Sequence, residues 1–483
     1  MINYNLQKEV IDTIKNSQGA TIQSIVRDLI KANNTDKLKM EKLWSEYTGK
    51  AKILTSIDNY NTPARPDNRL AHDFPTVIIQ QCVSYLLGNA IEVSLSEDGT
   101  NNYEAAEELL SKFLKLNFSE KLDAELGTYT GVCGKAFRLI FFAEKIDYLG
   151  KKSVELIMKN IKPWEGLIIT DSTVDEVIAG MIYYPIEIIN GTLKKFRNKV
   201  EFYDSKNVYY LIEDDGGNYK YDDSYGESIQ PHGFSFVPVV KFSNNTLEMG
   251  DFEKVRTLID AYDKAVSFGL NDYESYSMAY LIYHGVRPTE DELTKARLTK
   301  AFYIPIEDDL DVNNKIEFLT KEVNTQNLKD FVKMLNDDIF RFSAALDYTD
   351  ESFGGNQSGE SRKYKLIPLE QKAKDKERWF VYGFQQLYKV VTSFWAKTKS
   401  IQIDPEEITF TFTRNLPLDV TITDLISLQQ AGILSTETAI DMLPFIEDSV
   451  DEYEKVSGEY SNNLKHQLII PVNTDVSGSV EAI

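Results

Sequence analysis

The chain has 483 residues, of which 42% are hydrophobic and 27% charged, enough apolar material for two to four packed domains. It holds 53 lysines and arginines against 75 aspartates and glutamates, a net charge of −22. Because proteins that grip nucleic acid by its phosphates need a basic surface, this balance disfavours an ordinary duplex-binding protein.

The cysteines and the apolar stretches indicate the compartment. Cys82 and Cys133 lie far apart in apolar surroundings, which predicts reduced, buried thiols and no disulfide framework. Residues 1–20 lack the apolar segment of a signal peptide. The most apolar stretch, 77–93, contains three side-chain amides and is too polar to span a bilayer. We therefore expect a protein of a reducing, aqueous compartment with no membrane partner.

The first half of the chain reads as helices followed by strands. Over about the first 60 residues, apolar side chains recur at three- and four-residue spacing, which predicts helices. A polar loop is expected at 59–68, and the buried helix after it, 74–87, should stop at Gly88. Another amphipathic helix is predicted over 103–127. From 131 to 241, short β-prone runs separated by turn clusters indicate a meander-like sheet.

Two long helices with an insertion between them are predicted next. Asp251 is expected to cap the first helix, whose apolar positions step by three and four residues from Phe252 to Val266. Strand-like pieces and a short helix at 290–299 follow. The second helix is predicted from a single apolar stripe, formed by Leu328, Phe331, Val332, Leu335, Ile339, Phe342 and Leu346.

The rest of the chain is predicted to be mainly helical. A glycine-rich, acidic segment, 347–359, does not easily hold regular structure. A very long helical pattern follows from 359 to 397, with Pro368 as an expected kink. Residues 407–413 alternate like a strand, and short acidic helices, one of them capped by Ser435, come last. The elements together predict an α+β fold that is mainly helical.

No enzyme active site is predicted, and neither a cofactor nor a metal is expected. The run Gly131-Val132-Cys133-Gly134-Lys135 lacks the first glycine and the final Ser or Thr of a phosphate-binding loop, so we expect its glycines to allow close packing at a helix-to-strand turn. The four histidines are scattered without zinc-ligand spacing. Acidic pairs such as Asp337-Asp338 could hold metals for nuclease chemistry, but adjacent carboxylates on a helix do not face one centre.

Several short stretches carry a further signal through their order along the chain. Among them are Tyr47-Thr48-Gly49-Lys50, Asn68-Arg69-Leu70, Ser84-Tyr85-Leu86-Leu87-Gly88, Phe236-Val237-Pro238-Val239-Val240, Gly250-Asp251-Phe252-Glu253-Lys254-Val255 and Phe353-Gly354-Gly355-Asn356-Gln357-Ser358-Gly359. In this order they resemble the portal proteins of tailed bacteriophages, in particular those of long-tailed phages of Gram-positive hosts. The resemblance covers roughly residues 44–450, and its specificity lies in the collinear order.

This resemblance implies a portal fold with wing, stem, clip and crown regions, assembled as a ring, commonly of twelve subunits, or of thirteen in isolation. Carried onto this sequence, the regions are the N-terminal region and wing 1–250, the first stem helix 251–271, the clip 272–321, the second stem helix 322–346, the tunnel loop 347–358, the long kinked helix and return strand of the wing 359–418, and the crown and C-terminal tail 419–483.

The resemblance also implies which residues meet DNA. The tunnel loop would project toward DNA, its glycines giving mobility and its carboxylates discouraging tight phosphate contact. Its candidate residues are Asp347, Asp350, Glu351, Phe353, Gly354, Gly355, Asn356 and Gln357. Basic residues early in the long helix would line the channel or pair with carboxylates of a neighbouring subunit, and these are Arg362, Lys363, Lys365 and Lys372.

The function implied is a passive channel at one capsid vertex for DNA packaging and ejection. The implied partners are the terminase large subunit, the head-completion adaptor protein, the major capsid and scaffolding proteins, and double-stranded DNA that passes without sequence specificity. The protein would assemble in the host cytoplasm and reside in the virion. The alternatives are a non-viral helical scaffold that binds peptides and, less favoured, a metal-dependent nuclease.

Overall fold

The computed structural model divides into two compact units, 1–415 and 416–483. It describes residues 4–16, 21–55, 66–97, 100–146, 150–171, 176–190, 193–276, 280–283, 289–299, 316–319, 325–347, 359–415, 422–432, 434–441, 446 and 452–458. More residues lie in helices than in strands, and both kinds of element are abundant. The predicted α+β class, mainly helical, is therefore confirmed.

Two N-terminal helices pack against the larger sheet. They are α1 (Tyr4–Asn16) and α2 (Ile22–Tyr47), which is N-capped by the Thr21 side chain. The antiparallel sheet has the order β4-β5-β6-β7-β8, with β9 also paired to β7, so the predicted meander is confirmed. Its strands are β4 (Gly166–Thr170), β5 (Val177–Asn190), β6 (Leu193–Tyr203), β7 (Asn207–Glu213), β8 (Tyr219–Tyr221) and β9 (Ile229–Pro231).

A three-stranded sheet and four helices enclose the largest core. The sheet has the order β10-β2-β3, formed by β2 (Lys135–Ile146), β3 (Lys152–Ile161) and β10 (Val239–Ser243). The helices are α4 (Phe74–Leu87), α5 (Tyr103–Asn117), α6 (Ser119–Cys133) and α11 (Gly359–Thr398). The very long helix predicted from 359 is therefore confirmed, with Pro368 inside it. A short pair, β1 (Glu92–Ser94) with β13 (Thr409–Thr411), joins distant parts of the chain.

The single helix predicted over 103–127 is wrong, because α5 and α6 are separate. Phe118 has a φ of 49° between them, a left-handed conformation that ends α5. The buried Asn117 side chain explains the break. Its amide nitrogen donates to the Phe113 and Leu156 carbonyls, and its oxygen accepts from the Met158 amide, so it binds helix and strand at once.

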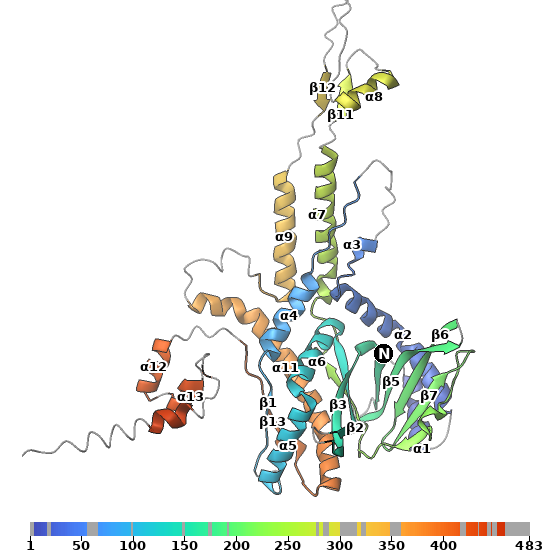
Figure 1. Ribbon diagram of the computed structural model, residues 1–483, viewed down its shortest axis with the longest axis vertical. Coiled ribbons are helices and arrows are strands. Elements are labelled where there is room, and N and C mark those ends of the chain that lie inside the picture. Colours follow the sequence, from blue (N-terminus) through green and yellow to red (C-terminus); the bar gives the residue numbers. More distant parts are fainter. Residues whose placement is uncertain are drawn as a thin grey trace, which may run out of the picture. The chain divides into compact units, whose positions relative to one another are not determined.

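The two long helices lie side by side and antiparallel (Figure 1). They are α7 (Arg256–Tyr276), preceded by the 3₁₀ turn η3 (Glu253–Val255), and α9 (Thr325–Ser343). They approach closely where a Cβ on Gly269 would collide with the Leu328 side chain. The chain between them holds α8 (Glu290–Thr299) and the antiparallel pair β11 (Tyr280–Tyr283) and β12 (Ile316–Leu319).

The predicted apolar stripe of the second helix is only partly buried. Leu335 and Ile339 are 5% and 0% exposed, whereas Phe331 and Phe342 are 46% and 60% exposed. The neighbouring helix therefore covers part of an apolar face that is wider than one helix contact.

The remaining elements are short. In the second unit, α12 (Ile422–Gln430) packs on α13 (Thr436–Asp441). The Thr438 amide donates to Ser435 Oγ at 3.1 Å, which confirms the predicted cap. The other short helices are α3 (Lys52–Thr55), η1 (Pro163–Glu165), η2 (Asp223–Tyr225) and η4 (Pro405–Glu407). Within the described ranges, no helix combines the length and apolar character needed to cross a membrane.

Candidate functional site: the junction at the base of α7

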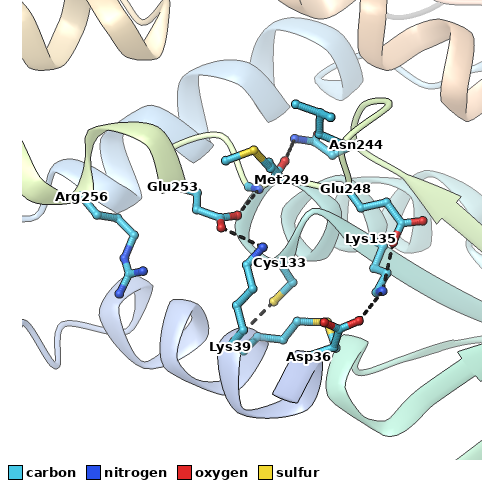
Figure 2. A network of polar contacts seen from close by, with 12 residues as sticks. Asp36, Lys39, Cys133, Lys135, Asn244, Glu248, Met249, Glu253 and Arg256 are labelled. Carbon is cyan, nitrogen blue, oxygen red and sulfur yellow. Dashed lines mark hydrogen bonds and ion pairs between the residues drawn. The ribbon is translucent and has the colours of Figure 1, made fainter. Parts of the chain in front are cut away.

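A network of ion pairs and hydrogen bonds surrounds the loop 244–255, which leads from β10 into α7 (Figure 2). Three further parts of the chain meet this loop: α2, the turn 131–135 between α6 and β2, and α11. We call this cluster the α7 base junction. It joins the helical rod to the body of the first unit.

The loop packs backbone against backbone on the turn 131–135. The Asp251 amide donates to the Gly131 carbonyl at 2.6 Å, and the Asn244 amide donates to the Gly134 carbonyl at 2.8 Å. A Cβ on Gly134 would collide with the Glu248 backbone, and Gly134 also has a φ of +84°. The close packing predicted for these glycines is therefore confirmed.

Asp251 is a buried carboxylate held by two lysines of α11. Its Oδ2 lies 2.9 Å from Lys376 Nζ, and its Oδ1 lies 3.3 Å from Lys372 Nζ. The Asn244 side-chain amide donates to the same Oδ1 at 3.0 Å. The predicted N-cap role of Asp251 is wrong because its carboxylate is turned toward α11. The Gly250 amide instead donates to Glu253 Oε2 at 3.1 Å.

Two ion pairs tie the start of α7 to α2. Lys39 Nζ lies 2.7 Å from Glu253 Oε1, with the glutamate side chain 13% exposed. Arg256 binds both carboxylate oxygens of Glu46, one of them through Nε at 2.7 Å. A bidentate guanidinium–carboxylate contact fixes orientation as well as distance. The Arg256–Glu46 pair therefore restrains rotation of α7 about its own axis.

The lysines of the junction control the ionisation of its buried acids. Burial alone would raise the pKa of Asp251, but the charges of Lys372 and Lys376 outweigh it and lower that pKa to about 2. Burial opposes ionisation of Glu248 as well, yet Lys135 and Lys241 lower its pKa to about 2. Both carboxylates therefore stay charged across the physiological range.

The lowered pKa of Glu248 predicts an acid-sensitive contribution to stability. A folded-state pKa below the unfolded value stabilises the protein above pH 4.5, and this stabilisation is lost as the pH falls toward about 2. We expect Glu248→Gln to lower the free energy of unfolding on the order of 2 kcal/mol near neutral pH and by less than about half of that near pH 3. Urea unfolding at both pH values measures this, with the exposed Glu120→Gln as control. A difference that does not change with pH would contradict the prediction.

Cys133 lies inside the junction but is not reactive. Its thiol is buried and donates to the Met40 carbonyl at 3.7 Å. Burial, followed by the charge of Glu253, raises the pKa of this thiol to about 12. Because the thiolate is the nucleophile, Cys133 serves packing and not chemistry. Both cysteines are free and buried, as predicted.

An extended strap, residues 66–73, runs along α7 above the junction. Alternate backbone amides of the strap donate to side chains one helical turn apart: Asn68 to Asn271 at 2.7 Å, Leu70 to Ser267 at 3.0 Å and His72 to Asp263 at 3.0 Å. The spacing fits because two extended residues advance about 6.6 Å and four helical residues about 6 Å. The strap therefore follows α7 in a fixed register.

The strap predicts a local change in hydrogen exchange. Ser267→Ala leaves the Leu70 amide without its acceptor, at a cost of about 1 kcal/mol or more for opening. We expect the peptide covering 66–73 to exchange roughly fivefold faster than in the unaltered protein. Exchange measured by mass spectrometry tests this, with the exposed Lys264→Ala on the same helix as control. Equal exchange in the two variants would refute the role of the strap contacts.

Of the site residues predicted from the sequence, the structure describes the side chains of Asp347, Lys365 and Lys372. Asp347 accepts a hydrogen bond from the Asn336 side chain at 2.7 Å. The other tunnel-loop residues, Asp350, Glu351, Phe353, Gly354, Gly355, Asn356 and Gln357, lie outside the described residues. Arg362 and Lys363 belong to α11, but their side chains also lie outside the described part. Lys365 is half-buried, and Lys372 contacts Asp251 and donates to the Ser343 carbonyl at 3.0 Å.

Sequence reasoning missed the burial of Asp263. This residue lies between the apolar positions of the first predicted long helix, yet it is 1% exposed beneath the strap. The available signal was the spacing of Asp263, Ser267 and Asn271, three short polar residues at four-residue intervals.

Among the described residues, no group of three or more His, Cys, Asp or Glu side chains is arranged to hold a metal.

Comparison with known proteins identifies the family. The family described as "Phage portal protein, SPP1 Gp6-like" matches residues 27–463. The chain belongs to this phage portal protein family. It is 24% identical over 420 residues to the portal protein of Bacillus phage SPP1, covering 83% of this chain and 78% of that protein. It is also 24% identical over 449 residues to the portal protein of Clostridium phage phiCD119, covering 89% and 94%.

The predicted resemblance to portal proteins of phages of Gram-positive hosts is thus confirmed, and the chain has a phage portal function. The family is structural, and phage portal proteins are components of the virion. At the base of α7, buried ion pairs hold this helix to α11 and to α2.

Proposed function

We propose that this portal protein forms a closed ring, commonly of twelve copies, around a channel at one capsid vertex. Double-stranded DNA passes through it during packaging and ejection without sequence-specific contacts. The observation that carries this proposal is the antiparallel pair of α7 and α9, bound at its base to α2 and α11 by buried charges. Such a helix pair is stiff enough to form one subunit's share of the channel wall.

The region assignments follow the same reasoning. In the proposal α7 and α9 are the stem helices, and β11, α8 and β12 belong to the clip between them. The elements before residue 251, together with α11 and β13, form the wing, and α12 with α13 belongs to the crown. The segment 347–358 is the tunnel loop facing DNA. Arg362, Lys363, Lys365 and Lys372 line the channel or meet a neighbour, and for Lys372 this would come in addition to its contact with Asp251.

The proposed partners act at different stages. The clip binds the terminase large subunit during packaging and then the head-completion adaptor protein. The major capsid and scaffolding proteins surround the ring as the head assembles in the host cytoplasm. The chain itself is a passive conduit, and another protein supplies the energy of packaging.

Electron microscopy of the purified full chain tests the ring directly. We expect closed rings of twelve or thirteen subunits at high protein concentration. Native mass spectrometry of the same sample gives the subunit number. Monomers or dimers alone would contradict the ring and favour a helical scaffold.

A further inference from the structure

A cavity of about 170 Å³ lies between the first turns of α7, the end of the strap and the segment 46–52 that leads from α2 into α3. In Figure 1, α3 stands beside α7. Part of the wall is apolar, with Pro75, Phe252 and Ile259 among the lining side chains. Because a cavity of about 150 Å³ can hold benzene, this one has room for an organic ligand of about six heavy atoms. We call it the strap pocket.

The lining of the strap pocket is more acidic than basic. It contains two cations, Lys52 and Arg256, and four carboxylates, those of Glu46, Asp73, Asp260 and Asp263. Both cations are already paired, because Arg256 binds Glu46 and Lys52 Nζ lies 3.3 Å from Asp260 Oδ2. Within the described ranges, neither Asp73 nor Asp263 forms an ion pair with a lysine or arginine. The pocket therefore carries negative charge that no permanent cation balances.

Asp263 is the buried carboxylate of this lining. Its side chain is 2% exposed, and both of its contacts with His72 end on Oδ1, at 3.0 Å from the backbone nitrogen and 2.9 Å from Nδ1. No described residue forms a hydrogen bond to Oδ2. Burial raises the pKa of the Asp263 carboxyl, and the hydrogen bonds from His72 offset this only in part. A buried carboxylate with a free oxygen beside a cavity favours a positively charged hydrogen-bond donor as ligand.

We propose that the strap pocket binds a short primary alkylamine in its ammonium form. The ammonium group donates a charge-assisted hydrogen bond to Asp263 Oδ2. The alkyl stem packs against the apolar wall formed by Pro75, Phe252 and Ile259. A bound amine ties the strap to α7 through a contact additional to those of the strap itself. This binding site goes beyond the proposed function and does not depend on the ring.

Other classes of ligand fit the strap pocket less well. The excess of carboxylates repels an anion such as phosphate. A divalent metal ion needs several oxygen ligands around one centre, and no group of three or more acidic, histidine or cysteine side chains in the described part is arranged to hold one. A neutral molecule of the same size fills the space but brings no charge to Asp263.

Saturation-transfer difference NMR on the purified full chain tests the site with n-butylamine as the probe. Two controls separate charge from stem: methylamine has the ammonium group without the stem, and 1-butanol has the stem without the charge. At about 0.15 M salt, general attraction to the acidic chain is screened. We expect the dissociation constant of n-butylamine to be at least about tenfold lower than those of both controls. Equal binding of n-butylamine and either control would overturn the proposal.

Two variants place the binding in the strap pocket. Asp263→Asn removes the charge and keeps an oxygen for the His72 amide. Ala71→Leu fills the pocket from an exposed position of the strap and changes no carboxylate. Each is expected to weaken n-butylamine binding at least about tenfold. The matched control, Asp272→Asn, alters an exposed acid of α7 outside the pocket lining and should bind as the unaltered chain does.

Hydrogen exchange gives a second readout at the strap. With n-butylamine at ten times its dissociation constant, the peptide covering 66–73 should exchange about tenfold more slowly, because the strap opens only when the ligand leaves. A folded pocket variant that binds n-butylamine as well as the unaltered chain overturns the proposal, as does a strap whose exchange the amine leaves unchanged. Because neither measurement depends on the number of subunits, either result leaves the proposed ring standing.

Discussion

Asp251→Ala is expected to lower the free energy of unfolding by about 3–5 kcal/mol. The Asp251 carboxylate and Lys376 are each 2% exposed and lie 2.9 Å apart. Removing the carboxylate leaves the Lys376 ammonium buried with no counter-charge near it, and this desolvation is the main cost. The urea midpoint of the purified chain, followed by tryptophan fluorescence, measures the change.

The double variant Asp251→Ala with Lys376→Met separates charge from packing. We expect it to be more stable than Asp251→Ala alone, since the unpaired ammonium is gone and a side chain of similar length fills its place. Asp215→Ala is the matched control for an ion pair in solvent. Asp215 is 70% exposed beside Lys195 and Arg197, so the loss there should stay within about 1 kcal/mol. Equal losses for Asp251→Ala and Asp215→Ala would refute the anchoring role of the junction.

Gly134→Ala is expected to be nearly as damaging, with a loss of about 3–5 kcal/mol. Two causes add. The φ of +84° is costly for any residue with a Cβ, and the added methyl would collide with the Glu248 backbone. Because the atoms that the methyl group would meet belong to the main chain, they cannot move aside as a flexible side chain could. Thermal unfolding and the yield of soluble protein are the measurements.

Gly150→Ala isolates the conformational cost. Gly150 has a similar φ of +80°, but nothing lies within 4 Å of the position of its Cβ. We expect a loss of about 1–2 kcal/mol there, from backbone strain alone. The excess loss in Gly134→Ala then reports the close packing of the loop 244–255 on the turn. Similar values for the two variants would show that this packing contributes nothing.

Much of the fold follows from local periodicity. The helices near 74–87 and 359–397, the meander and the cap at Ser435 were predictable because each depends on residues near one another in sequence. The break at Phe118 was not, because Asn117 ends α5 by bonding to β3, about 40 residues later in the chain.

The candidate site was harder to predict because its contacts span the chain. Asp251 meets Lys376 across 125 residues, and His72 meets Asp263 across 191. On the sequence, Asp251 had the pattern of a helix cap, which many aspartates before helices share. Its burial against α11 depends on where α11 passes, and no local pattern reports that.

By itself, the sequence determined the acidic composition, the helix–insertion–helix order and the likeness to portal proteins. These depend on residue types and their spacing, which the chain carries before it folds. Only the tertiary structure decided that Asp251 anchors α7, that the strap binds Asp263, and that α9 and α11 each keep an exposed face. The physical reason is that burial and charge pairing are properties of neighbours in space, which packing brings together from distant positions.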